Sequence, residues 1–105
     1  MNTVSVRIGG ETRELDAASE SWINDQLKRR RGGGQDVCVQ VAVHAGDIQL
    51  SLTTPGCGGG LGGGRQANSR ELDIIELWNR LHLNQATFTG GNLIAFLKQL
   101  GQKLA

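Results

Sequence analysis

Polar and hydrophobic residues alternate over residues 4–8, where two valines and an isoleucine are separated by a serine and an arginine. This period of two places one face of a β-strand on a core. Gly9-Gly10 comes next, and a glycine pair accepts the positive φ angles that a tight hairpin turn demands. The chain can therefore return as a second strand over residues 12–15, which predicts an N-terminal β-hairpin.

The clearest alternation follows at residues 37–43, where four valines occupy every second position, and it resumes over residues 48–52. The link Ala45-Gly46 between the two runs is short. Because parallel strands need a long crossover, the runs are predicted to form an antiparallel hairpin. All four valines point to one face, which we expect to meet a helix. The other face is more polar and carries Gln40, His44, Gln49 and Ser51.

Three further segments repeat hydrophobic residues every three to four positions, the spacing of an amphipathic helix. The first covers residues 17–31, with Asp16 before it as an N-cap and three glycines, residues 32–34, after it as a stop. The second covers residues 69–83 and the third covers residues 92–104. The sequence therefore predicts three helices.

Polar residues mark the starts of the last two helices. Asn68 or Ser69 can cap the second helix, and Glu71 stands three residues after Asn68, as in a capping box. Asn92, or Thr89 just before two glycines, can open the last helix.

The resulting element order is ββαββαα. We expect a single α+β domain with a mostly antiparallel four-stranded sheet, made of two hairpins and packed with three helices. Residues 1–53 form the ββαββ unit, residues 54–67 a glycine-rich loop, and residues 68–105 a pair of C-terminal helices. The order over residues 3–53 resembles β-grasp, ubiquitin-like domains in topology, although it shares no motif with them and is followed by two extra helices. Such a resemblance carries little functional weight.

Charge and targeting signals limit the class of protein. Eleven Lys and Arg against ten Asp and Glu leave a net charge of +1, so no whole-molecule field attracts nucleic acid or a membrane. The N-terminus lacks the apolar core of a signal peptide, and no run reaches the length of a membrane span. We therefore expect a cytoplasmic protein with no membrane partner. In that reducing compartment Cys38 and Cys57 are expected to be free thiols, Cys38 as a small buried hydrophobic residue.

Glycine is concentrated in one loop, since seven of the 16 glycines lie between residues 56 and 64. A glycine loop between a strand and a helix N-terminus can bring bare amides close to a phosphate, and arginine adds charge. Against a nucleotide site, the P-loop lysine is missing and the preceding hairpin is antiparallel. The loop is therefore either a mobile connector, or a loop ordered only by a partner, or a phosphate, nucleotide or nucleic-acid site. The residues of this ligand or partner loop are Gly56, Cys57, Gly58, Gly60, Gly63, Arg65 and Arg70.

No catalytic set is visible in the sequence. Cys57 is accessible in the loop, but a nucleophile needs a base, and nothing brings His44 or His82 to it. Asp73 and Glu76 lie one turn apart, yet no residue supplies the remaining ligands of a metal. The enzyme question stays undecided with a non-enzyme favoured, and we expect no catalytic residue, no metal and no cofactor.

Two surfaces could meet a partner. A basic edge at the end of the first helix consists of Lys28, Arg29, Arg30 and Arg31. The last helix is apolar on more than one side, which is typical of deep burial or of contact with a second chain. Its expected interface residues are Leu93, Ile94, Phe96, Leu97 and Leu100.

The sequence therefore favours a small cytoplasmic adaptor or accessory protein, without enzymatic activity, that binds a protein partner or forms a homo-oligomer through its C-terminal helices. The glycine-rich loop and the basic edge would form its recognition surface. The alternative is a protein that binds a phosphate, a nucleotide or a nucleic acid through the loop and Arg65.

Overall fold

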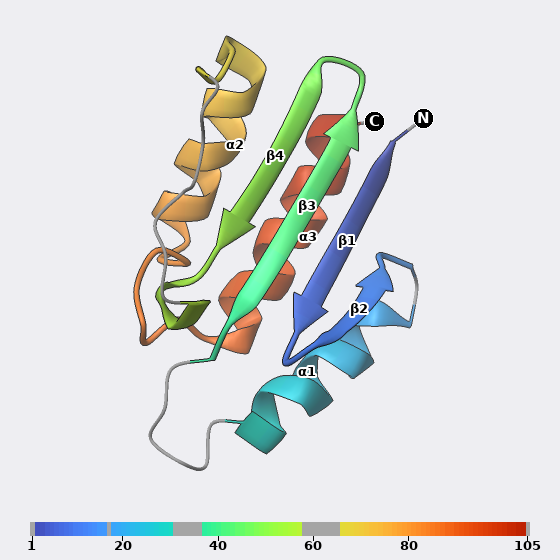
Figure 1. Ribbon diagram of the computed structural model, residues 1–105, viewed down its shortest axis with the longest axis vertical. Coiled ribbons are helices and arrows are strands. Elements are labelled where there is room, and N and C mark those ends of the chain that lie inside the picture. The colour runs from blue at the N-terminus through green and yellow to red at the C-terminus, as the bar shows by residue number, and fades with distance from the viewer. Residues whose placement is uncertain (1, 17, 31–36, 58–65, 105) are drawn as a thin grey trace.

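The computed structural model describes residues 2–16, 18–30, 37–57 and 66–104. They form a four-stranded sheet in which all three strand pairs are antiparallel, in the order β2-β1-β3-β4, together with three α-helices (Figure 1). In chain order the elements are β1 (Thr3–Ile8), β2 (Glu11–Glu14), α1 (Ser19–Arg30), β3 (Val39–Ala45), β4 (Ile48–Thr53), the 3₁₀ turn η2 (Pro55–Cys57), α2 (Ser69–Arg80) and α3 (Gly90–Leu104). The predicted α+β class and the order ββαββαα are confirmed.

Both hairpins turn on glycines with positive φ. Gly9 and Gly10 have φ angles of 59° and 91° and join β1 to β2 with two residues between the strands. Gly46, with a φ angle of 60°, opens the turn between β3 and β4. Because few residues other than glycine adopt these angles readily, the two turns fix the register that the alternating pattern requires.

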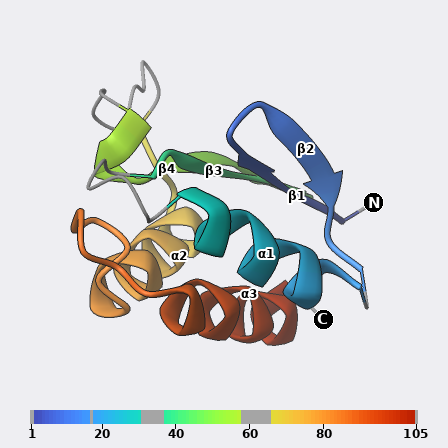
Figure 2. The same ribbon diagram turned by 90° about the horizontal axis from the view of Figure 1, so that it is seen from below.

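The helices lie on one face of the sheet (Figure 2). The alternating valines of β3 are fully buried there, together with most of the apolar residues of β1 and β4, while Val4 and Leu50 are partly buried. Trp78 of α2 packs edge-on against Phe96 of α3, with ring centroids 5.1 Å apart. The helices contribute Ile23, Leu27, Ile74, Leu77, Trp78, Leu93, Phe96, Leu97 and Leu100 to this core.

The opposite face of the sheet carries no described helix, and its side chains are polar or small. Strand pairing aligns them in rows, for example Arg7, Gln40 and Thr53. Gln40 donates a hydrogen bond to the Ser51 hydroxyl at 2.8 Å across this face. The predicted separation of a valine face from a polar face is therefore confirmed.

The first turn of α2 is the capping box that the sequence predicts. The Asn68 side chain accepts from the Glu71 backbone N–H at 2.9 Å, and the Glu71 carboxylate accepts from the Asn68 backbone N–H at 2.8 Å. The second oxygen of Glu71 accepts from the backbone N–H of Gln49 in β4 at 2.9 Å. One fully buried carboxylate therefore caps α2 and attaches it to the edge of the sheet.

The first helix begins at Ser19 and not at residue 17. The bounds of the other two helices also differ from the prediction, and local hydrogen bonds explain both of these differences. The helix predicted over residues 69–83 ends at Arg80 because His82 adopts a φ angle of 62°, and its N–H bonds back to Asn79 while the N–H of Leu83 bonds to Trp78. The last helix begins at Gly90 and not at Asn92, which confirms the alternative start at Thr89: the Thr89 hydroxyl accepts from the Asn92 N–H at 3.1 Å. Among the described helices, none is long and apolar enough to cross a bilayer.

Candidate functional site

A groove with a volume of about 270 Å³ runs between α1 and α3 and closes against the end of β2. We call it the interhelical groove. Its apolar floor is formed by one residue after β2, one from α1 and two from α3, and charged residues stand at its rim. The lining residues are Leu15, Asp16, Glu20, Ile23, Ile94, Leu97, Lys98 and Gly101.

At one end of the groove α3 presents Gly101, which has no side chain. A Cβ atom built on Gly101 would meet no atom within 4 Å. Ile23 and Leu97 belong to the core and are almost fully buried, whereas Leu15 and Ile94 are half-buried and present apolar surface to the opening. The two packed helices therefore provide a concave apolar surface, the shape in which small molecules and partner side chains bind.

The lining residues of the rim carry two carboxylates and one ammonium group, and Arg13, outside the lining, lies 3.8 Å from Asp16. Lys98 lies 3.8 Å from Glu20, and both side chains are more than half exposed. The pKa of Asp16 lies below its ordinary value of 3.8, first because the Ala18 N–H donates to its carboxylate and then because the Ser19 hydroxyl does so, with Arg13 adding to the effect. Asp16 therefore keeps its negative charge beside the groove at neutral pH.

The structure buries most of the residues that the sequence offered as an interface. Leu93, Phe96, Leu97 and Leu100 lie in the chain's own core, so their side chains are not a free surface for a second chain. Ile94 is half-buried and, with the edge of Leu97, lines the interhelical groove. The accessible apolar part of α3 is thus a groove wall.

The basic edge is only partly a free surface. Lys28 and Arg29 are exposed at the end of α1. The Arg30 guanidinium instead turns toward the first hairpin and donates to the carbonyl of Gly9 at 3.4 Å. Arg31 lies outside the described residues.

The described part of the glycine loop does not present an empty phosphate site. Gly56 and Cys57 form the η2 turn. Arg70 forms an ion pair with Asp47 at 3.0 Å, and the buried Glu71 carboxylate already occupies the N-terminus of α2. A second anion there would face this charge at close range. The remaining loop residues named above, Gly58, Gly60, Gly63 and Arg65, lie outside the described residues.

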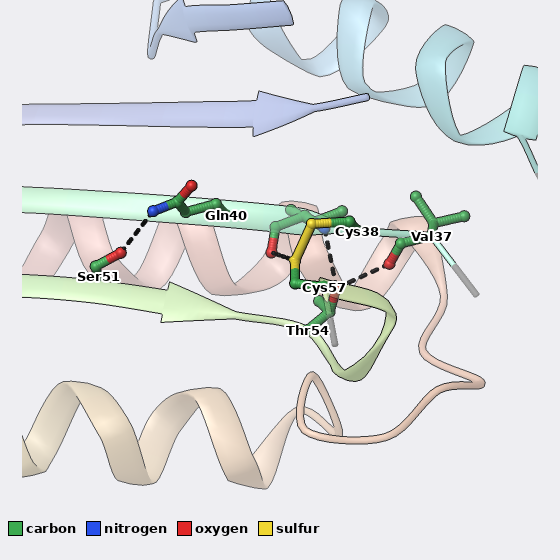
Figure 3. The surroundings of a disulfide bond; sticks show 7 residues. Val37, Cys38, Gln40, Ser51, Thr54 and Cys57 are labelled. Carbon is green, nitrogen blue, oxygen red and sulfur yellow. Dashed lines mark hydrogen bonds between the residues drawn. A yellow bond between two sulfur atoms is a disulfide. The ribbon is translucent and has the colours of Figure 1, made fainter. Parts of the chain in front are cut away.

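The cysteines correct the expectation of two free thiols. Cys38 and Cys57 form a disulfide with Cα atoms 4.4 Å apart, and Figure 3 shows it joining the start of β3 to the turn after β4. Cys38 is exposed and does not lie in the core. Alternate residues of a strand point to opposite faces, and Cys38 is two residues before Gln40. Cys38 therefore lies on the polar face and not on the valine face.

The two histidines do not complete a catalytic set with the sulfur atoms. His44 lies on β3 and His82 just after α2, and neither is hydrogen-bonded to a cysteine in the described bonds. Within the part of the chain that the structure describes, no three His, Cys, Asp or Glu residues gather as a metal site.

Comparison of the chain with protein families, with curated proteins and with solved structures finds no match. The similarity of residues 3–53 to β-grasp domains therefore rests on the order of elements alone.

The interhelical groove was not predicted from the sequence. The one signal was Gly101, a residue that weakens a helix interior and so invites a packing or functional reason.

Proposed function

We propose that this protein is a small interaction protein without enzymatic activity, and that it binds an amphipathic helix of a partner protein in the interhelical groove. The observation that carries the proposal is the groove itself, with an apolar floor at Leu15, Ile23, Ile94 and Leu97 and an acidic rim. Helix-in-groove binding places apolar side chains spaced by three to four residues into such a surface.

The length of the groove supports a helical occupant. Ile94 and Gly101 lie seven residues apart on α3, and at 1.5 Å per residue this corresponds to about 10 Å, or two helical turns. Two apolar side chains at positions i and i+7 of the partner helix, seven residues apart, span that distance. A volume of about 270 Å³ holds such side chains, although it lies below the range of about 300–1,000 Å³ typical of drug-sized ligands.

The charge of the rim supports a basic partner. Asp16 and Glu20 outnumber Lys98 among the lining residues, and the Arg13 that lies near Asp16 stands outside the groove, so a lysine or arginine beside the apolar anchors would gain an attractive contact. Charge complementarity of this kind acts mainly on specificity and association rate.

A second copy of this chain fits the groove less well than a different protein does. A self-contact needs an exposed apolar side chain to insert, and among the described residues the exposed large hydrophobic residue is Leu72 of α2. Insertion of Leu72 into the groove of a neighbour would be a head-to-tail contact that produces open chains unless the rotation closes. The homo-oligomer expected from the sequence is therefore less favoured than a partner of another kind.

Binding of a nucleic acid is also less favoured. Single-stranded nucleic acids stack on exposed aromatic rings. Trp78, Phe88 and Phe96 are buried, and Trp22 is half-buried against the core.

Cytoplasmic location remains a prediction, and the disulfide weakens it because disulfides persist mainly in oxidising compartments.

Binding of two designed helical peptides tests the proposal. Both carry leucine at two positions seven residues apart, and they differ only in flanking lysines or glutamates. We expect the lysine peptide to bind more tightly and to shift the amide NMR signals of Ile23, Ile94 and Gly101. Signals that shift only on the open face of the sheet, or equal binding of both peptides without shifts at these residues, would contradict the proposal.

A further inference from the structure

The Cys38–Cys57 disulfide lies where it can react. Cys38 is exposed just before β3, and Cys57 is half-buried at the end of η2 (Figure 3). Thiol–disulfide exchange requires that an attacking thiolate reach one sulfur atom, so the exposed residue is the accessible target.

Hydrogen bonds hold the same junction without the disulfide. Thr54 is fully buried, and its hydroxyl donates to the carbonyl of Val37 at 2.8 Å and accepts from the N–H of Val39 at 2.9 Å. The backbone N–H of Thr54 also donates to the carbonyl of Val39 at 3.0 Å. These bonds join the start of β3 to the end of β4, so loss of the S–S bond leaves the strands attached.

The surroundings of Cys57 can hold the thiol that forms after the S–S bond breaks. Its sulfur lies 3.6 Å from the carbonyl oxygen of Val39, and its backbone N–H donates to the carbonyl of Thr54 at 3.0 Å. Once protonated, the released thiol can donate to the Val39 carbonyl without movement of the turn.

We propose that this disulfide is a thiol–disulfide exchange site, at which a small thiol attacks Cys38 and Cys57 leaves. The thiolate forms a new S–S bond with the Cys38 sulfur, the Cys38–Cys57 bond breaks, and its electron pair leaves on Cys57, which takes a proton from water. A second small thiolate then attacks the sulfur of the first, the bond from that sulfur to Cys38 breaks, and Cys38 leaves as a thiolate that takes a proton from water. Both protein cysteines end as thiols, and two molecules of small thiol are oxidised to their disulfide.

The site is independent of the interhelical groove. The groove is formed by α1, α3 and the end of β2, whereas the disulfide joins residues beside β3 and β4 on the polar side of the sheet. A result that contradicts one of the two proposals therefore does not contradict the other.

The experiment treats the oxidised protein with reduced glutathione, stops the reaction with acid and N-ethylmaleimide, and locates the adducts by mass spectrometry. Trypsin is unsuitable because no Lys or Arg lies between the two cysteines, but cleavage before Asp47 separates them. We expect the early mixed disulfide on Cys38 and the maleimide on Cys57. Glutathione found mainly on Cys57, or a bond that resists a large excess of glutathione, would overturn the proposal.

Two variants and one spectrum complete the test. Cys57→Ser leaves Cys38 as the single thiol, and Cys38→Ser leaves Cys57. We expect Cys38 to react with an aromatic disulfide reagent about fivefold faster or more, because it is the exposed residue. The fully reduced wild-type protein should keep its dispersed amide NMR spectrum. Equal rates in the two variants, or a spectrum of an unfolded chain after reduction, would contradict the proposed exchange site.

Discussion

Replacement of Glu71 by alanine should destabilise the protein strongly although the residue touches no proposed binding surface. The carboxylate is fully buried and accepts backbone hydrogen bonds from Asn68 at 2.8 Å and from Gln49 at 2.9 Å. A hydrogen bond to a charged group contributes about 1.5–3 kcal/mol. Glu71→Ala removes both of these bonds, but water can reach the half-buried Asn68 and bond to its N–H instead. We therefore expect the variant to lower the free energy of unfolding by about 3–4 kcal/mol.

Two further variants make the reasoning specific. Glu71→Gln keeps one oxygen acceptor but turns an NH₂ group toward the other backbone N–H, so about half of the loss, about 2 kcal/mol, should remain. Glu76→Ala is the matched control on the same helix. Glu76 pairs with Arg80 at 3.0 Å, both side chains are about two-thirds exposed, and such a pair contributes about 0.5 kcal/mol or less.

Urea unfolding measures the three free energies, and hydrogen exchange of the Gln49 amide reports the edge of β4 directly. Glu71→Ala should speed exchange at Gln49, while Glu76→Ala should leave it unchanged. Similar losses for Glu71→Ala and Glu76→Ala would refute the claim that one buried carboxylate holds α2 to the sheet.

Three other changes follow from single features of the structure. His82→Gly should raise the free energy of unfolding by about 1 kcal/mol in urea titrations, because the φ angle of 62° is unfavourable for histidine; a loss of stability would contradict this. Cys57→Ser should lower it by about 3 kcal/mol, since the bond spans 19 residues, and an unchanged unfolding midpoint would count against this value. Asp16, whose folded-state pKa lies below 3.8, contributes stability that is complete above its unfolded-state pKa and is lost as pH falls through the folded-state pKa. The melting temperatures of wild type and Asp16→Asn should therefore differ at neutral pH and converge in acid, and a difference that persists at the acid end would show another cause.

The sheet could be predicted from the sequence because its information is local. Alternation over residues 37–43 determines which face is buried, and the glycine turns determine which strands are neighbours. The capping box at Asn68 was equally local, since both partners lie within four residues. These features depend on backbone geometry over a few neighbouring residues. The types of those residues are therefore enough to predict them.

The disulfide could have been inferred from the pairing of the two strands beside it. The register that pairs Gln40 with Thr53 places Cys38 opposite the first residues after β4, where Cys57 follows within a short turn. The expectation of free thiols rested on a reducing compartment alone, without the strand register.

The interhelical groove could not be predicted in the same way. It depends on how α1 and α3 are spaced across the sheet, and the two helices are separated by most of the chain. The apolar character of α3 indicated either burial or an interface. Most of its apolar side chains are in fact buried in this chain's own core. Tertiary placement decided which side chains, such as Ile94, remained accessible.

Affinity of the lysine-containing helical peptide for two variants at Gly101 tests the central claim most directly. Gly101 lines the groove with open space beside it, so Gly101→Trp should fill the groove and Gly101→Ala should leave it open. Gln99→Trp, at an exposed position of α3 outside the groove lining, controls for the added ring. We predict that Gly101→Trp weakens binding by about tenfold or more while the other two variants bind like wild type. Wild-type affinity in the folded Gly101→Trp variant would contradict the account.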